Sequence, residues 1–193
     1  MSYFGFNKGS VMDLSNELQQ KILAKLGLAD WRRAAVLVPY FIENNEAHLI
    51  FTQRTDVVEH HKGQICFPGG MQDHAEETLW ETALRECEEE IGLNRDLISF
   101  ITELNPQITP TGFLVTPFVG QIQKPAQWNP NPSEIASIFS VPVSHLKDPQ
   151  NSRFVTRIWE SVEFFEPHFA YEHHDIWGMT GRVVCDFLEK VSL

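Results

Sequence analysis

The segment 69–93 constrains this chain more than any other, because it joins a pair of glycines to a long run of helix-forming residues. The run from Thr78 to Ile91 contains no Gly or Pro, and Gly92 follows it directly. Its apolar side chains recur at four-residue spacing, at Leu79, Ala83, Cys87 and Ile91. This pattern predicts an amphipathic helix over 78–91, preceded by a loop over 60–70 in which the glycines let the backbone approach a ligand.

Three carboxylates of this predicted helix share one face. At about 100° per residue, Glu89 and Glu90 lie on either side of the direction of Glu86. Repulsion between such like charges costs only roughly 0.2–0.5 kcal/mol per pair, so energy alone does not exclude a solvated acidic face. The alternative is a site for divalent cations that prefer oxygen ligands, Mg²⁺ or Mn²⁺.

The remaining patterns predict a domain of mixed helices and strands. The amphipathic segment from Asp13 to Gly27 predicts a first helix, and the residues from Ile176 to Val191 predict a last one. Short runs rich in β-forming residues predict a hairpin over 34–54, with Pro39 indicating an edge strand or a bulge. Further strands are expected at 96–104, 112–122, 135–143 and 153–165. Without regular alternation of strand and helix, an α+β sandwich is expected rather than a doubly wound sheet.

Composition excludes several classes of protein. The 193 residues carry a net charge of −11, which argues against a protein that neutralises nucleic-acid phosphates. No apolar run approaches the length of a membrane span, and the start shows no signal-peptide pattern. The three widely spaced cysteines, Cys66, Cys87 and Cys185, form neither a disulfide framework nor a paired zinc motif. A soluble, cytoplasmic protein without nucleic-acid or membrane partners is expected, in an oligomeric state that the sequence leaves open.

The stretch 85–93 reads Arg-Glu-Cys-Glu-Glu-Glu-Ile-Gly-Leu and matches every position of R-E-U-x-E-E-x-G-U, in which U is apolar. This is the core of the Nudix box, so the chain resembles the Nudix hydrolases. The usual box has Gly, five residues, Glu and seven residues before the Arg, whereas here six residues separate Gly70 from Glu77. The longer loop is similar to that of the Nudix branch that splits coenzyme A and its derivatives.

That branch has a second motif before the box: an apolar pair, Thr, any residue, Arg, Ser or Ala, three residues, Arg, three residues, Gly, three residues and Phe-Pro-Gly-Gly. The chain keeps this spacing from Ile50 through Arg54 and Gly63 to Gly70. Thr55 replaces Ser or Ala, and Glu59 replaces Arg. Because the charge at position 59 is reversed, another nucleoside diphosphate derivative, such as ADP-ribose, remains an alternative substrate. The resemblance covers roughly 34–191.

The resemblance implies an architecture and a site. It implies a Nudix-type α/β/α sandwich with a mixed sheet over 34–193, with residues 1–33 as a helical extension. Glu86 and Glu90 would bind Mg²⁺ or Mn²⁺, together with the Gly70 carbonyl, while Glu89 would be a further ligand or the general base. Arg85 would pair with Glu77 and fix the loop to the helix. The implied substrate-binding residues are Arg54, Gly63, Phe67 and Gly69.

The implied reaction is hydrolysis of a diphosphate linkage, with coenzyme A or an acyl-coenzyme A as substrate and adenosine 3',5'-bisphosphate and 4'-phosphopantetheine as products. The alternatives are a pyrophosphatase for ADP-ribose or a related compound, and a Nudix module that senses a nucleotide without cleaving it. Glu134 is a second candidate for the general base, since some Nudix enzymes place one in a later loop.

Other residues have a structural interpretation beside a functional one. Arg54 either binds a substrate phosphate or is an ordinary surface residue, and Cys87 is expected in the core. The aromatic residues either stack on an adenine or pack in the core; they are Phe164, Phe165, Phe169 and Tyr171. A second metal site is not predicted from the histidine pairs, because neighbouring side chains are expected to point in different directions; these are His60, His61, His173 and His174.

Overall fold

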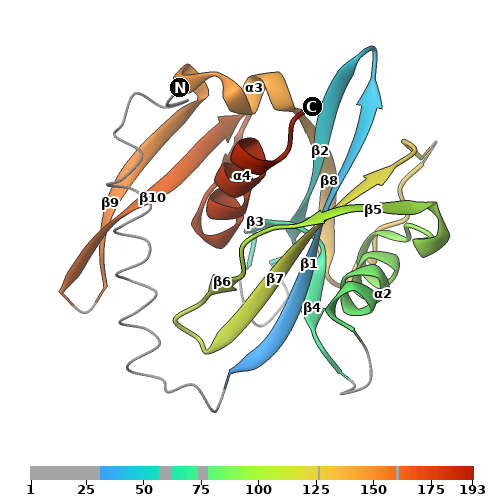
Figure 1. Cartoon of the computed structure of the whole chain (residues 1–193), viewed down its shortest axis with the longest axis horizontal. Coiled ribbons are helices and arrows are strands. Elements are labelled where there is room, and N and C mark those ends of the chain that lie inside the picture. Colours follow the sequence, from blue (N-terminus) through green and yellow to red (C-terminus); the bar gives the residue numbers. More distant parts are fainter. Residues whose placement is uncertain (1–30, 57–61, 74–77, 126, 160) are drawn as a thin grey trace.

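The computed structural model describes residues 31–56, 62–73, 78–125, 127–159 and 161–193 (Figure 1). The predicted helix from Asp13 to Gly27 lies outside these residues, as do Glu59, His60, His61 and Glu77. The predicted domain start at Ala34 falls just inside the first described strand, which begins at Arg32.

Eight of the described strands form one mixed sheet with the central order β3-β2-β1-β7-β5, in which β4 also pairs with β1, β6 with β7 and β8 with β2. The β1–β7 pair is parallel and the others are antiparallel. The strands are β1 (Arg32–Glu43), β2 (Glu46–Arg54), β3 (Ile65–Cys66), β4 (Gly69–Met71), β5 (Ile98–Glu103), β6 (Gln107–Ile108), β7 (Phe113–Ile122) and β8 (Ile135–Pro142). The predicted loop at 60–70 therefore contributes two short strands, β3 and β4.

The predicted hairpin is β1–β2. Asn44 and Asn45 both have positive φ, 53° and 62°, as required by the tight turn whose twist matches that of the strands. The expectation for Pro39 was wrong, because β1 is a central strand. Its pairing with β4 ends at Val36, and its pairing with β2 begins at Tyr40. Pro39 lies between the two and, among the described strands, pairs only with Gly120 of β7, so the edge of β1 that faces β4 and β2 needs no N–H from it.

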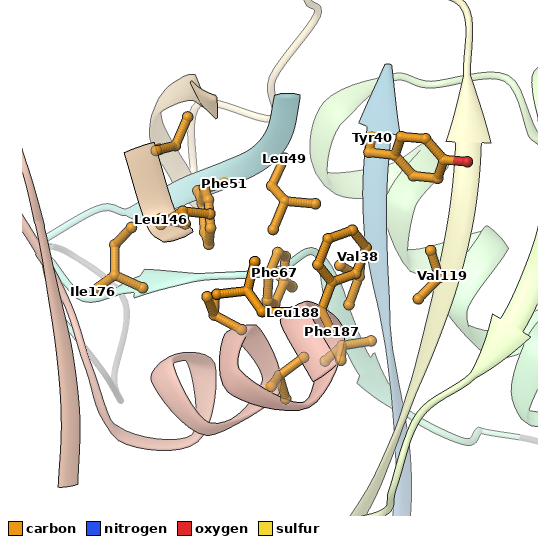
Figure 2. Packing of buried hydrophobic residues seen from close by; sticks show 14 of the residues in the cluster. Val38, Tyr40, Leu49, Phe51, Phe67, Val119, Leu146, Ile176, Phe187 and Leu188 are labelled. Atoms are coloured by element: carbon orange, nitrogen blue, oxygen red, sulfur yellow. The ribbon is translucent and has the colours of Figure 1, made fainter. Parts of the chain in front are cut away.

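The two faces of β1 carry different helices, which gives the predicted α/β/α sandwich. Residues Ala35, Leu37 and Phe41 pack with α2 (Leu79–Ile91). The alternate residues Val36, Val38 and Tyr40 pack on the other face with α4 (Gly178–Lys190), as Figure 2 shows for Val38, Tyr40 and Phe187. Since successive side chains of a strand point to opposite faces, the continuous apolar run of β1 follows from burial on both sides.

A three-stranded antiparallel sheet flanks α4 (Figure 1). Its strands are β9 (Ser152–Trp159), β10 (Val162–Tyr171) and β11 (His174–Ile176). The predicted strand 153–165 is thus a hairpin that turns at Ser161, whose φ is 70°. The last helix begins at Gly178 rather than Ile176, which belongs to β11. The chain also forms α3 (Val143–Lys147) and 3₁₀ turns at Arg95–Leu97 and Pro149–Asn151.

Candidate active site

Local interactions define both ends of α2. At its start, the Thr78 hydroxyl accepts a hydrogen bond from the Glu81 N–H (3.2 Å), and the Glu81 carboxylate accepts one from the Thr78 N–H (2.7 Å). This capping box satisfies two N–H groups that the helix itself leaves unpaired. At its end, Gly92 is left-handed with a φ of 68°, and its N–H bonds the Glu88 carbonyl. The predicted helix is therefore confirmed, with fixed ends.

Burial of one helix face decides where the carboxylates point. Ala83, Cys87 and Ile91 are buried against the sheet, so the face carrying Glu86 and Glu90 turns toward β4. Cys87 is a core residue as expected, and burial raises the pKa of its thiol, which makes it a poor nucleophile. Cys66 and Cys185 are also free thiols.

Glu86 lies directly against Gly70 of β4. A methyl group on Gly70 would overlap the Glu86 carboxylate, with its Cδ only 2.5 Å away, so any side chain at position 70 would displace this carboxylate. Burial raises the pKa of Glu86 above its ordinary value, opposed by a hydrogen bond from Arg85. The Gly70 loop and the helix carboxylate thus form one surface.

Glu90 is the most deeply buried carboxylate of the site, with 3% of its side chain exposed. Its Oε2 accepts a hydrogen bond from the Gly69 N–H (3.1 Å), and its Oε1 lies 3.3 Å from Nη1 of Arg54. Burial raises the pKa of Glu90 to about 7, against the opposing effects of Gly69 and Arg54. Helix α2, strand β2 and strand β4 therefore meet at this one side chain.

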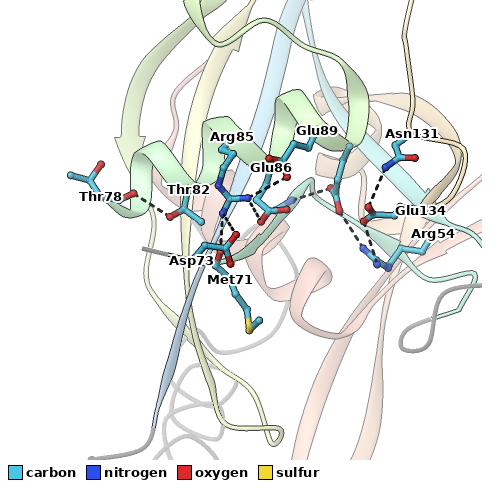
Figure 3. Close-up of polar contacts among 12 residues, drawn as sticks. Arg54, Met71, Asp73, Thr78, Thr82, Arg85, Glu86, Glu89, Asn131 and Glu134 are labelled. Carbon is cyan, nitrogen blue, oxygen red and sulfur yellow. Dashed lines mark hydrogen bonds and ion pairs between the residues drawn. The ribbon is translucent and has the colours of Figure 1, made fainter. Parts of the chain in front are cut away.

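Arg85 fixes the loop to the helix. Its Nη2 donates to the Met71 carbonyl (3.0 Å) and lies 3.6 Å from Asp73, while its Nη1 contacts Glu86 (2.8 Å) and Glu89 (3.2 Å). The predicted pair with Glu77 lies outside the described residues. Glu89 is the outermost of the three acids, 59% exposed, and its carboxylate lies beside the Arg85 guanidinium (Figure 3).

Arg54 and Glu134 lie on the side of the site away from Arg85 and Asp73 (Figure 3). Arg54 ends β2, next to a register shift in the pairing of β2 with β8, and such bulges re-aim a side chain. Its Nη2 lies 4.0 Å from Oε2 of Glu134, which immediately precedes β8. The site thus contains both candidates for the general base, Glu89 and Glu134. It also contains Asn131, which sequence reasoning missed because it lies in a run of turn-forming residues.

The other predicted substrate residues have unequal positions. Gly63 has a φ of 65°, and its carbonyl accepts a hydrogen bond from the Gln53 side chain (3.4 Å). It follows shortly after residues 57–61, which the structure does not describe. The expected substrate contact of Phe67 needs correction: its ring is buried, with a centroid 4.8 Å from that of Phe51. Phe67 therefore anchors the start of β4 to the core.

The aromatic residues of β10 and the His173–His174 pair lie outside this group of residues. Phe169 is fully buried and Tyr171 packs against the same core, whereas Phe164 and Phe165 are partly exposed. The expectation that neighbouring histidines diverge was wrong for one pair: the rings of His173 and His174 are 4.0 Å apart. With Glu172 they form a turn whose ligand atoms all lie within 4.8 Å of one another, although His174 is stacked on Phe139.

The donor atoms at α2 and β4 fit a divalent cation. The half-buried Glu86 and the buried Glu90 face the glycine pair, and the Arg54 guanidinium lies at hydrogen-bond distance from Glu90. Burial raises the pKa of both carboxyl groups, and a cation bound between them would favour their ionised form. Hard oxygen donors of this kind suit Mg²⁺ or Mn²⁺. Glu86 and Glu90 would hold such an ion.

Replacing Arg85 by Ala should lower both activity and stability, because one side chain joins the helix carboxylates to the Met71 carbonyl. We expect kcat to fall about 100-fold, and the free energy of unfolding to fall by roughly 1–3 kcal/mol. Arg95→Ala is the matched control, since Arg95 pairs only with the exposed Glu88 on the same helix in the described structure. Steady-state kinetics and urea unfolding measure both effects. Equal behaviour of the two variants would contradict the bridging role.

The raised pKa of Glu90 predicts that the stability of the protein depends on pH when a chelator has removed divalent cations. A carboxyl group with a raised pKa in the folded state stabilises the fold below its unfolded pKa, near 4.5, and this contribution is lost as pH rises through about 7. The loss should be on the order of 2–4 kcal/mol. Urea unfolding at pH 5 and pH 8 should therefore show a steeper loss of stability for the wild type than for Glu90→Gln. Parallel pH profiles of the two proteins would show that Glu90 titrates normally.

The fold and the site together define a class of protein: an α/β/α sandwich whose helix presents an acidic cluster to a glycine pair. Residues 31–173 match the NUDIX domain family. The chain therefore belongs to the Nudix family and is a Nudix hydrolase, an enzyme acting on nucleoside diphosphate derivatives, a class that generally requires divalent cations.

Two relatives agree with this assignment, and one solved structure shares the fold. The chain is 31% identical over 162 residues to the "uncharacterized Nudix hydrolase NudL" of Photorhabdus laumondii, covering 84% of this chain and 86% of that protein. It is 33% identical over 169 residues to the protein of the same name from Klebsiella pneumoniae, covering 83% of each. A MutT/nudix family protein from Enterococcus faecalis has a similar fold, with a TM-score of 0.54, 13% identity, and coverage of 95% of this chain and 74% of that one.

Within the described ranges, no helix has the length and apolar character required to cross a membrane.

Proposed function

We propose that this Nudix hydrolase is a coenzyme A diphosphatase that uses Mg²⁺ or Mn²⁺. The proposal rests on one observation: residues of both sequence motifs lie together at the Glu90 carboxylate. Arg54 and Gly69 belong to the coenzyme A motif, Glu90 belongs to the Nudix box, and both motif residues contact the Glu90 carboxylate. The spacing between Arg54 and the glycine pair, which distinguishes this branch in sequence, thus has a direct consequence at the site.

The proposed reaction is hydrolysis of the diphosphate linkage. A water oxygen forms a bond to one phosphorus, the bond from that phosphorus to the bridging oxygen breaks, and the water proton passes to a carboxylate base. Bound cations would offset the charge of the diphosphate and of the transition state. Glu86 and Glu90, with Glu89 and the Gly70 carbonyl, would hold these cations. Arg54 would release Glu90 in part to bind a substrate phosphate.

A substrate panel tests this proposal. Coenzyme A, acetyl-coenzyme A, dephospho-coenzyme A and ADP-ribose are each incubated with the protein and Mg²⁺ or Mn²⁺, and the products are separated by chromatography. We expect adenosine 3',5'-bisphosphate and 4'-phosphopantetheine from coenzyme A, with a higher kcat/KM than for ADP-ribose. A preference for ADP-ribose would favour the second candidate, which the acidic Glu59 supports. Glu90→Gln, purified identically, controls for a contaminating hydrolase.

The remaining alternative is a module that binds a nucleotide without cleaving it. The presence of all three box carboxylates, Glu86, Glu89 and Glu90, argues against it, because a sensor has no need of a hydrolytic metal site. Tight nucleotide binding by calorimetry, with no turnover of any substrate in the panel, would favour this alternative.

A further inference from the structure

The loop 129–134, which leads into β8, is attached to the last turn of α2. The Asn131 N–H donates to the Glu90 carbonyl (2.9 Å), and the Asn129 N–H donates to the Ile91 carbonyl (3.4 Å). Carbonyls at the end of a helix lack partners within it, so the loop supplies them. Asn129 also lies tightly over Gly92, where a Cβ would meet its Cβ at 2.8 Å. The loop and the helix end therefore form one unit.

The Asn131 side chain uses both ends of its amide. Its Oδ1 accepts hydrogen bonds from the N–H (3.2 Å) and the hydroxyl (2.7 Å) of Ser133, which closes a local turn. Its Nδ2 donates to Oε1 of Glu134 (3.2 Å). The oxygen therefore serves the turn, whereas the amino group serves the Glu134 carboxylate.

Glu134 is fixed through its backbone as well. Its N–H donates to the Asn131 carbonyl (3.1 Å), and its carbonyl accepts from the Thr55 N–H (2.8 Å). The second oxygen of its carboxylate, Oε2, lies 4.0 Å from Nη2 of Arg54, and the side chain is 42% exposed. Glu89, the other candidate base, already has an oxygen bound by Arg85 at 3.2 Å. In the described structure, the Glu134 carboxylate is hydrogen-bonded by a neutral amide, Arg54 lies farther away at 4.0 Å, and the side chain is open to solvent, to which it can release a proton.

We infer that Asn131 is a positioning residue that holds the Glu134 carboxylate toward the site, where Glu134 takes the proton of the attacking water. This inference rests on the proposed hydrolysis. Asn131 contacts neither substrate nor the reacting atoms; it acts through Glu134. By bonding the Glu90 carbonyl, it also ties the position of this base to the helix that carries the cation ligands.

Exchanging the side-chain amide of residue 131 with the carboxyl group of residue 134 tests the inference. Asn131→Asp keeps the oxygen that accepts from Ser133 but places an acceptor against the Glu134 carboxylate. Glu134→Gln removes the carboxylate. The double variant restores a hydrogen bond in the reverse direction, from the amide at 134 to the carboxylate at 131, without a carboxylate at position 134. Melting temperature, kcat and KM are measured for all four proteins, with the panel compound that the wild type hydrolyses fastest.

We expect Asn131→Asp to lower kcat about 10-fold with KM within about twofold, and Glu134→Gln to lower kcat about 100-fold. The double variant should regain the wild-type melting temperature while its kcat stays at the Glu134→Gln value. Ser133→Ala, which keeps the Ser133 N–H bond, is the control and should stay within about twofold of the wild type in kcat.

Two results would overturn the inference while the wild type is active: recovery of kcat together with melting temperature in the double variant, or an unchanged kcat in Asn131→Asp. The double variant decides the question even if Asn131→Asp does not fold. A wild type that hydrolyses no compound of the panel would instead refute the proposed function, and the inference with it.

Discussion

Replacing Glu90 by Gln is expected to lower kcat by about 10²–10³-fold while leaving the protein folded. Gln has nearly the same shape, so the packing of the end of α2 is kept. It removes the charge of a side chain that meets Gly69 and Arg54 and that is proposed to bind the cation. The activating Mn²⁺ concentration should rise in the same variant. Steady-state kinetics over a Mn²⁺ titration and circular dichroism measure these effects.

Glu88→Gln is the matched control for this experiment. Glu88 lies on the same helix, two residues away in sequence, but its exposed carboxylate pairs with Arg95 outside the site. It should keep wild-type kcat and the wild-type Mn²⁺ dependence. Full activity in Glu90→Gln would end the proposal of a metal site at α2. Equal losses in both variants would indicate that the total charge of the helix matters rather than the position of Glu90.

A methyl group at Gly70 is expected to lower kcat about 100-fold with a small change in stability. The added Cβ would overlap the Glu86 carboxylate, which is the end of a flexible side chain and can move aside. In moving, Glu86 leaves the position from which it faces β4. Kinetics and thermal unfolding of Gly70→Ala separate these two effects.

Gly69→Ala provides the contrast, because the same atom added one residue earlier meets backbone. Its Cβ would overlap the Ala35 carbonyl and lie 2.6 Å from the Cα of Val36, in the centre of the sheet. We expect this variant to lose several kcal/mol of stability, about 2–4, because neither strand can give way. If Gly70→Ala proves the less stable of the two, or remains fully active, the placement of Glu86 against Gly70 is wrong.

Where local pattern alone decides structure, the sequence was a sufficient guide. The α2 helix followed from helix-forming residues, a four-residue apolar repeat and Gly92, all of which act within a few turns of chain. The strands near 34–54, 96–104, 112–122 and 135–143 followed in the same way from short β-forming runs. The core of the Nudix box could be identified from residues 85–93, because all positions of its pattern lie in one short stretch of sequence.

Errors arose where a residue's environment comes from distant chain. Pro39 indicated an edge strand, but it lies in a central strand at the junction between two partners. The run 153–165 contains no glycine or proline at its turn, so nothing local separated β9 from β10. Phe67 lay in a ligand-binding motif, yet its side chain is buried, because it packs on Phe51 of β2, which lies far from it in sequence.

The sequence by itself determined the helix, its acidic face and the glycine pair, since each is written in neighbouring residues. Only the tertiary structure decided which groups those acids meet. Arg54 lies 36 residues before Glu90, and Asn131 and Glu134 come from a loop beyond β7. Their convergence depends on the pairing of β2 with β8 and on the loop that completes the end of α2. Such long-range register is set by packing the whole sheet between two helices, which no local spacing encodes.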